Sequence, residues 1–194
     1  MGFLKLMLVF TPWLCLLVIG QGSLLRLKIG LATALVVSVV MSLTGVHRGI
    51  IMVVGLVFFT CATVAVVLFD NMWTAVHMGM LAHGALALSA WGSVAIGRPF
   101  TMDYARQHTH PSLWTSPPFI RINNIITSVW ALAFTVNVVL GWGKLEHFLL
   151  PELAYDLVSY ALLIGAVGFS NWYPAHVRKQ APALSRPSAA PPAR

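Results

Sequence analysis

Six apolar stretches, each about as long as a membrane-spanning helix, constrain the fold of this chain more than any other feature. They cover residues 3–19, 27–43, 50–69, 73–96, 125–142 and 153–172. A helix needs about 20 mostly apolar residues to cross the hydrocarbon core of a bilayer. The chain is 58% hydrophobic and 9% charged, and so few charges cannot cover a water-facing surface. We therefore expect an all-α, polytopic membrane protein with six transmembrane helices.

The first two stretches are the least certain spans because they are close to the minimum length and because Pro12 lies inside the first one. A cleaved signal peptide is one alternative for the first stretch, since Lys5 precedes its apolar region. Residues 20–23 form an imperfect cleavage site, however, and the next stretch follows at once. A short re-entrant pair is a second alternative, which would include both stretches.

Lysine and arginine residues are distributed unevenly over the connections between the stretches. With the N-terminus inside, nine of the 12 cationic residues fall on the cytoplasmic side: Lys5, Arg48, Arg98, Arg106, Arg121, Arg178, Lys179, Arg186 and Arg194. The other side holds Arg26, Lys28 and Lys144. Because cytoplasmic loops are enriched in such residues, we expect both termini in the cytoplasm. The same rule explains the formal net charge of +7, so we expect no nucleic-acid partner.

Two segments are not expected to span. The transmembrane domain covers residues 1–179 and includes a cytoplasmic loop at about 97–124, whose aromatic residues favour a position against the membrane surface. Residues 180–194 are mostly Ala, Pro and Ser, with two Arg. This composition predicts a disordered cytoplasmic tail.

Polar side chains within the apolar stretches are the first candidates for a functional role, because burying them in lipid is costly. His77 and His83 are six residues apart in the fourth stretch, so their side chains point about 240° apart and cannot share one ion. We expect His83 to form a hydrogen bond between helices. For Asn123, Asn124 and Asn137 we expect packing between helices, with a polar path as the alternative.

Small residues recur every fourth position in the same stretch, at Ala85, Ser89 and Ser93. Such a stripe lets another helix approach closely. We expect it to pack within the chain, and a homo-oligomer formed through this stripe is the alternative.

The motifs of common enzyme classes are missing from the sequence. It has no P-loop, no HExxH, no GxSxG and no pair of acidic residues within a span. We therefore expect no enzymatic activity, no catalytic residue, no cofactor and no metal.

One element before and within the fifth stretch resembles a known family. It comprises Pro111-Ser112-Leu113-Trp114, Arg121-Ile122-Asn123, Trp130-Ala131-Leu132-Ala133-Phe134 and Asn137. This order is similar to that of the intracellular septation protein A family. Phe10-Thr11-Pro12 and Arg98-Pro99 also resemble elements of that family in the same order.

The resemblance implies a small multi-pass protein of the bacterial inner membrane. It implies a role in septation, cell division and envelope organisation through contacts with other membrane proteins. The structural or interaction residues that we select are Arg98, Trp114, Arg121, Asn123, Trp130 and Asn137, together with His83. Among these, we expect Trp114 to anchor the loop at the interface and Asn123 to cap the fifth helix.

Three functions remain open, and each predicts a different structural feature. A non-enzymatic envelope scaffold, our first hypothesis, predicts a packed interior and partners among the lipid bilayer and membrane proteins of division. A small transporter or channel predicts a polar cavity around His83, Asn123 and Asn137. A haem-binding electron-transfer subunit predicts a second histidine on another helix, such as His47.

Overall fold

The structure, a computed structural model, describes residues 10–44, 49–148 and 151–184, and these contain helices and no strand. The α-helices are α2 (Thr11–Ile19), α3 (Leu24–Leu43), α4 (Ile50–Thr63), α5 (Met72–Val76), α6 (Met78–Ala95), α7 (Thr101–Ala105), α8 (Pro117–Leu145) and α9 (Glu152–Leu184). A π-helical turn, Val64–Leu68, continues α4, and two 3₁₀ turns, Arg106–His108 and Pro111–Leu113, follow α7. The all-α prediction is confirmed for this part of the chain.

Four helical segments are long and apolar enough to cross a membrane. They are Leu24–Leu43, Ile50–Leu68, Pro117–Leu145 and Glu152–Lys179, and they correspond to the second, third, fifth and sixth apolar stretches. The other two stretches form α2 and α6. Only nine residues of the first stretch lie in α2, since residues 3–9 are outside the described ranges. Helix α6 has 18 residues, many of them Gly, Ala and Ser, which lower its hydropathy.

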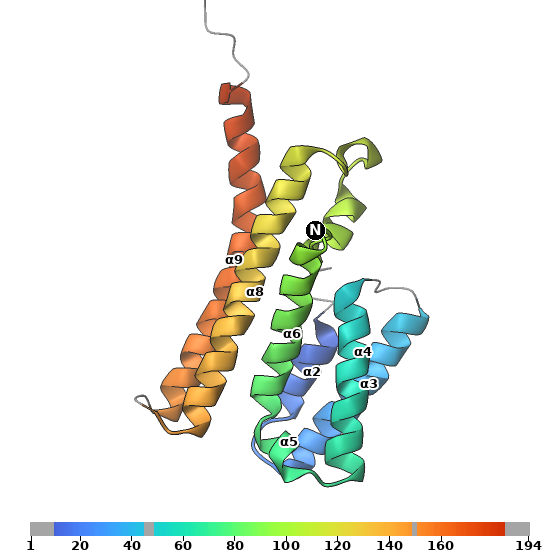
Figure 1. Cartoon of the computed structure of the whole chain (residues 1–194), viewed down its shortest axis with the longest axis vertical. Coiled ribbons are helices and arrows are strands. Elements are labelled where there is room, and N and C mark those ends of the chain that lie inside the picture. The colour runs from blue at the N-terminus through green and yellow to red at the C-terminus, as the bar shows by residue number, and fades with distance from the viewer. Residues whose placement is uncertain (1–9, 45–48, 149–150, 185–194) are drawn as a thin grey trace, which may run out of the picture.

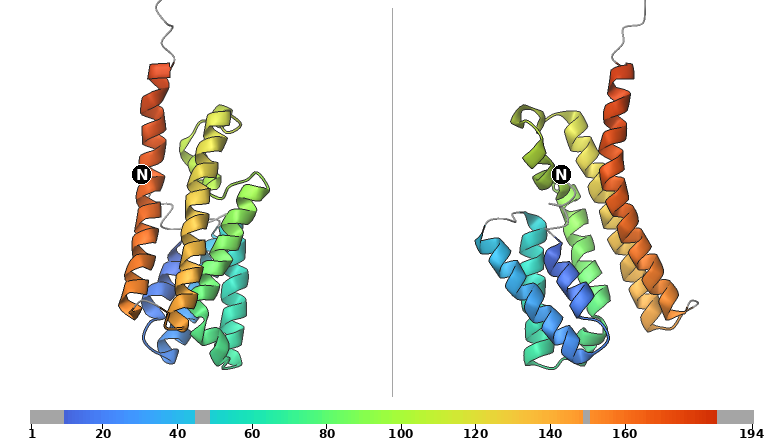
Figure 2. Two further views of the ribbon diagram at one scale, coloured as in Figure 1. Left: turned by 60° about the vertical axis from the view of Figure 1, so that its left-hand side comes forward. Right: turned by 180° about the vertical axis from the view of Figure 1, so that it is seen from behind.

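The helices form an antiparallel bundle in which α6 lies between α4 and α8 (Figure 1). On one side α8 pairs with α9 as a long hairpin, and on the other α2 and α3 pack together beside α4 (Figure 2). The α2–α3, α4–α5 and α8–α9 connections share one end of the bundle, which we call the hairpin end. The opposite end carries α7, and we call it the α7 end.

Several helix boundaries follow from local chemistry. The Ser23 hydroxyl accepts a hydrogen bond from the Arg26 N–H at 3.2 Å and begins α3, and the Asn71 side chain accepts one from the Thr74 N–H at 2.9 Å and begins α5. Such caps satisfy amide groups that the helix leaves unpaired. The fourth stretch is interrupted at His77, which has φ −89° and ψ 7° and separates α5 from α6.

Two sequence-based boundaries are corrected. The fifth helix begins at Pro117 rather than near residue 125, because proline fits the first turn of a helix, where its missing N–H has no partner to lose. The loop that was expected to be cytoplasmic is therefore shorter than residues 97–124. The last helix extends to Leu184, five residues into the segment expected to be disordered, and residues 185–194 lie outside the described ranges.

An aromatic cluster holds α2 against the centre of the bundle. Phe10 stacks on Trp130 of α8 with ring centres 5.3 Å apart, and its ring lies 6.2 Å from that of Phe134. Trp13 packs on Phe58 and Phe59 of α4, with ring centres 5.1 and 4.7 Å apart. The short helix α2 thus connects the two sides of the bundle through its aromatic side chains.

Candidate functional site

The structure divides the seven residues selected from the sequence into two groups. His83, Trp130 and Asn137 line one large cleft. Arg98 and Trp114 lie beside α7 and its 3₁₀ turns in sequence, and Arg121 and Asn123 lie in the first turns of α8. The cleft has a volume of about 930 Å³. Its lining residues come from α2, α5, α6, α8 and α9, with Leu27 of α3. Because α6 packs directly on α8, the cleft lies between α9 on one side and α2 and α6 on the other. This volume lies within the range of small-molecule sites.

The lining of the cleft combines charged, polar and apolar groups. At the hairpin end, Lys144 Nζ contacts both carboxylate oxygens of Asp156, at 2.7 and 2.8 Å, and Glu152 and Tyr155 lie beside them. Apolar side chains line the same end, among them Leu16, Leu27 and Met78. Further from this end the lining includes the polar residues Ser159, Tyr160, Asn137 and His83 and the apolar residues Phe10, Trp130, Phe134, Leu86, Leu163 and Val167.

Asn137 is the most unusual residue of the lining. Its side chain is 2% exposed, and neither its amide nitrogen nor its amide oxygen has a hydrogen-bond partner among the described residues. A buried polar group without a partner costs about 1–3 kcal/mol. Because α8 rises about 1.5 Å per residue, Asn137 lies about 10 Å below Lys144 along the cleft wall. Both amide atoms are closed to solvent, so they face protein rather than the open space of the cleft.

His83 lies at the same depth as Asn137 on the facing helix. A side-chain carbon on Gly84 would lie 3.9 Å from Val138, which puts the two helices in register at this level. His83 Nδ1 is 2.9 Å from the Gly79 carbonyl, which can only accept, so Nδ1 donates and Nε2 of the neutral ring is an acceptor. The hydrogen bond that the structure shows for His83 is thus to a carbonyl of its own helix, and the bond expected to another helix stays a prediction.

Asn123 belongs to a separate polar network at the α7 end. The Thr101 hydroxyl lies 3.1 Å from the Asn123 carbonyl, 3.2 Å from its side-chain oxygen and 2.8 Å from the Thr127 hydroxyl. The Asn123 amide donates to the Phe119 carbonyl at 2.8 Å. The predicted cap is wrong, since Ser116 is the N-cap of α8 and Asn123 lies inside the helix. The network instead fastens α7 to α8.

The other three selected residues lie around this network. Trp114 is half-buried, its ring nitrogen donates to the Thr109 carbonyl at 2.9 Å, and the Arg106 guanidinium lies 5.3 Å from its ring centre. Arg98 and Arg121 are exposed. Burial raises the pKa of the nearby Asp103 carboxyl, while Arg106 and Arg98 oppose this shift. The loop thus presents a cationic surface around one acidic group.

The stripe of small residues is inside the bundle. Ser89 is 4% exposed and Ser93 is fully buried, where its hydroxyl accepts a hydrogen bond from the Phe100 N–H at 3.1 Å. The expected packing within the chain is confirmed. A homo-oligomer through Ala85, Ser89 and Ser93 stays an alternative prediction, although Ser89 and Ser93 are buried within this chain.

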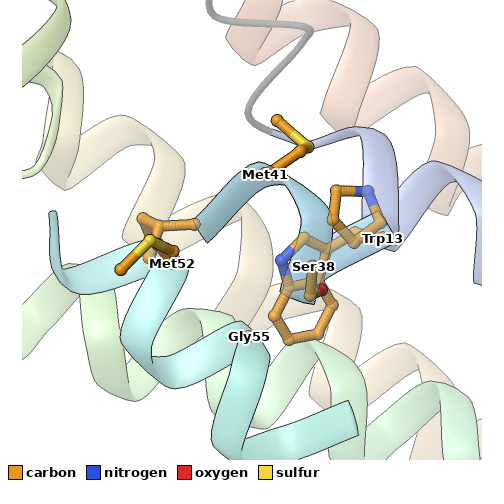
Figure 3. A pocket seen from close by; sticks show the side chains of 7 residues that line it. Trp13, Ser38, Met41, Met52 and Gly55 are labelled. Carbon is orange, nitrogen blue, oxygen red and sulfur yellow. The ribbon is translucent and has the colours of Figure 1, made fainter. Parts of the chain in front are cut away.

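A second, much smaller cavity of about 10 Å³ lies between α2, α3 and α4 (Figure 3). Trp13, Ser38 and Gly55 line it, and the Ser38 hydroxyl has no partner among the described residues. This volume suits at most one water molecule. The cavity is therefore too small to be a ligand site.

No family model, no curated protein and no solved structure matches this chain. The resemblance to the intracellular septation protein A family therefore stays a prediction, and the site has to be interpreted from its own geometry.

Sequence reasoning missed the residues of α9 that line the cleft. Glu152, Tyr155, Asp156, Ser159 and Tyr160 recur three and four residues apart. This spacing places polar groups on one face over the first two turns of a helix. This spacing is visible in the sequence, but it fits the start of a spanning helix equally well.

Proposed function

We propose that this chain is a six-span protein of the bacterial inner membrane that binds a membrane-soluble molecule in its cleft and performs no catalysis. The observation that carries the proposal is the 930 Å³ cleft, whose lining includes His83 and Asn137. A scaffold was expected to have a packed interior, whereas a carrier was expected to have a cavity near His83 and Asn137. The cleft favours the second hypothesis, although Asn123 does not line it.

The number of spans is part of the proposal. Helices α2 and α6 lie alongside the four long apolar helices, and successive connections alternate between the two ends of the bundle (Figure 1). Arg98, Arg106, Arg121 and Arg178 belong to the cytoplasmic side in this arrangement. At the hairpin end, Lys28 and Lys144 are paired with Asp70 and Asp156, which reduces the positive charge there.

Fusions of alkaline phosphatase, which is active only outside the cytoplasm, test this topology. We expect an inactive enzyme when it is fused after Arg178 and an active one when it is fused after Glu146, because the positive-inside rule places these positions on opposite sides. The activity of matched cultures, normalised to fusion abundance, gives the result. Strong activity after Arg178 would overturn the six-span arrangement with a cytoplasmic C-terminus.

Filling the cleft tests the binding function. Gly79 lines the cleft and has no atom within 4 Å of an added side-chain carbon, so Gly79→Leu should occupy the ligand volume without a clash. Gly92 on the same helix has equally open surroundings but does not line the cleft, and Gly92→Leu is the matched control. We expect the first change to weaken binding at least about 10-fold, a loss of about 1.4 kcal/mol, and the second to leave it unchanged.

The measurement uses tryptophan fluorescence. Trp13 and Trp130 line the cleft, and the other five tryptophans are replaced by phenylalanine. A lipid with a brominated acyl chain should quench the remaining emission in a saturable way in detergent micelles. Equal saturable quenching in Gly79→Leu and wild type would contradict binding in this cleft.

The envelope role implied by the family resemblance is a second candidate function. Its specific support is the exposure of Arg98 and Arg121 at the α7 end, where a cytoplasmic partner could contact both. The haem hypothesis has no comparable support, because His47 lies outside the described residues. Cleft binding and partner contact use opposite ends of the bundle and can both be true.

A further inference from the structure

Resting on the proposed function, we infer that the occupant of the cleft is one hydrocarbon chain of a diacyl phospholipid, taken sideways from the leaflet at the hairpin end of the bundle. In the proposed topology this is the outer leaflet of the membrane. The head group of the lipid stays at the membrane surface, outside the cleft.

An ion pair and exposed tryptophans mark the hairpin end of the cleft as the membrane surface. Lys144 of α8 pairs with Asp156 of α9 at this end. Trp142 of α8 and Trp73 of α5 lie at the same end and are 58% and 60% exposed. Tryptophan is enriched where the hydrocarbon meets the head groups, and charged side chains are costly in the hydrocarbon itself. The Lys144–Asp156 pair therefore lies at the level of the lipid head groups.

The length of the cleft matches the thickness of one leaflet. On α8 the lining extends from this ion pair to Trp130. Trp130 lies about 21 Å from Lys144 along the helix, at about 1.5 Å per residue. A bilayer is about 40–45 Å thick with its head-group layers, so one leaflet is about 20–22 Å thick. The inner end of the cleft therefore lies near the middle of the bilayer, where the chains of one leaflet end.

Three helices meet at the inner end of the cleft. Phe10 of α2 stacks on Trp130 of α8, with ring centres 5.3 Å apart. The Trp130 ring nitrogen donates to the Ser170 hydroxyl of α9 at 2.9 Å. The Phe10 ring also lies 6.2 Å from the ring of Phe100, which precedes α7. In the described part of the chain, these contacts close the cleft toward the α7 end and separate it from the lipids of the other leaflet.

The cleft opens to the side, between α2 and α9. Leu14 of α2 and Ile164 of α9 both line the cleft and are 40% and 70% exposed, so they form its rim. Ile164 lies about 12 Å from Asp156 along α9, which places this rim at the depth of the hydrocarbon. An exposed apolar rim at this depth contacts lipid chains. A chain can therefore move from the leaflet into the cleft without crossing water.

The lining suits a chain rather than a head group. Apolar and aromatic side chains outnumber polar ones, and they continue from the rim to the inner end through Phe134, Leu163 and Val167. Such a surface offers dispersion contacts to a flexible apolar chain. Phosphate heads are normally held by free cationic groups, and Lys144 is already paired with Asp156.

The test places a brominated diacyl phospholipid in one leaflet only. The variant that keeps only Trp13 and Trp130 is reconstituted into vesicles, and the brominated lipid is exchanged into their outer leaflet. A protease-cleavable tag at the C-terminus, at the opposite end of the bundle, is protected in molecules whose hairpin end faces outward. Across preparations of different orientation, doubling this protected fraction should double the quenching. The quenching should be lost in Gly79→Leu and kept in Gly92→Leu, which does not line the cleft.

The outcomes separate the two proposals. Quenching that falls as the protected fraction rises would show entry from the other leaflet, and quenching that is independent of this fraction would show entry from both. Either result overturns the inference and leaves the binding function standing. Saturable quenching in micelles with none in vesicles does the same, because it would show that chains do not enter sideways. No quenching sensitive to Gly79→Leu, in micelles or in vesicles, overturns the binding function itself.

Discussion

Replacing Trp130 by alanine is expected to lower the free energy of unfolding by about 3 kcal/mol or more. The side chain is 3% exposed and lies between the rings of Phe10 and Phe134, at centre distances of 5.3 and 5.4 Å. Its ring nitrogen also donates to the Ser170 hydroxyl of α9. The change removes the contacts that join α2, α8 and α9, and packing of this kind, rather than hydrophobic burial, holds helices together in lipid.

Trp142→Ala is the matched control, because Trp142 is on the same helix and is 58% exposed. Unfolding of the purified protein in mixed micelles should show a large loss for the first variant and a change below about 0.5 kcal/mol for the second. Similar losses in both would mean that the aromatic cluster does not hold the bundle together. Binding of the brominated lipid should fall with Trp130→Ala as well, since Trp130 forms part of the cleft wall.

Gly30→Leu is the second change with a large expected effect. A side-chain carbon at Gly30 would lie 2.9 Å from the backbone nitrogen of Gly20 and 3.0 Å from its Cα. Backbone atoms cannot rotate away as a side chain can, so α2 and α3 must separate. Overpacking of this kind costs about 1–3 kcal/mol, and the bulk of leucine favours the upper end of that range.

The same micelle unfolding measurement checks this prediction. Gly165 on α9 has no atom within 4 Å of an added side-chain carbon, so Gly165→Leu is the control and should be close to neutral. Separation of α2 from α3 should also move Phe10 and Trp13, both of which line the cleft, and reduce ligand binding. Full stability in Gly30→Leu would show that the close contact between α2 and α3 is not required.

The long apolar helices could be predicted because hydrophobic length is a local property. The stretches at residues 27–43 and 50–69 agree closely with Leu24–Leu43 and Ile50–Leu68. The start of α8 was misplaced because polar residues such as Arg121 and Asn123 resemble a loop in sequence, whereas Pro117 begins a helix there. Because α8 begins earlier, Asn123 lies inside the helix and bonds Thr101 instead of capping the helix.

The cleft could not be predicted because it depends on how far α9 lies from α2 and α6. Asn137 and His83 were selected individually for being polar within apolar stretches, but their common depth follows from the register of α6 against α8. The pairing of Lys144 with Asp156 likewise joins two helices. Tertiary distances of this kind leave little trace in a single sequence.

The central claim is that a membrane-soluble molecule occupies the cleft, and an electron microscopy map of the protein in lipid nanodiscs tests it most directly. The account predicts elongated density that extends from the level of Asn137 to Trp130, between α6, α8 and α9, and that is absent in Gly79→Leu. A map in which α9 closes against α2 and α6, with side chains filling the space, would contradict it.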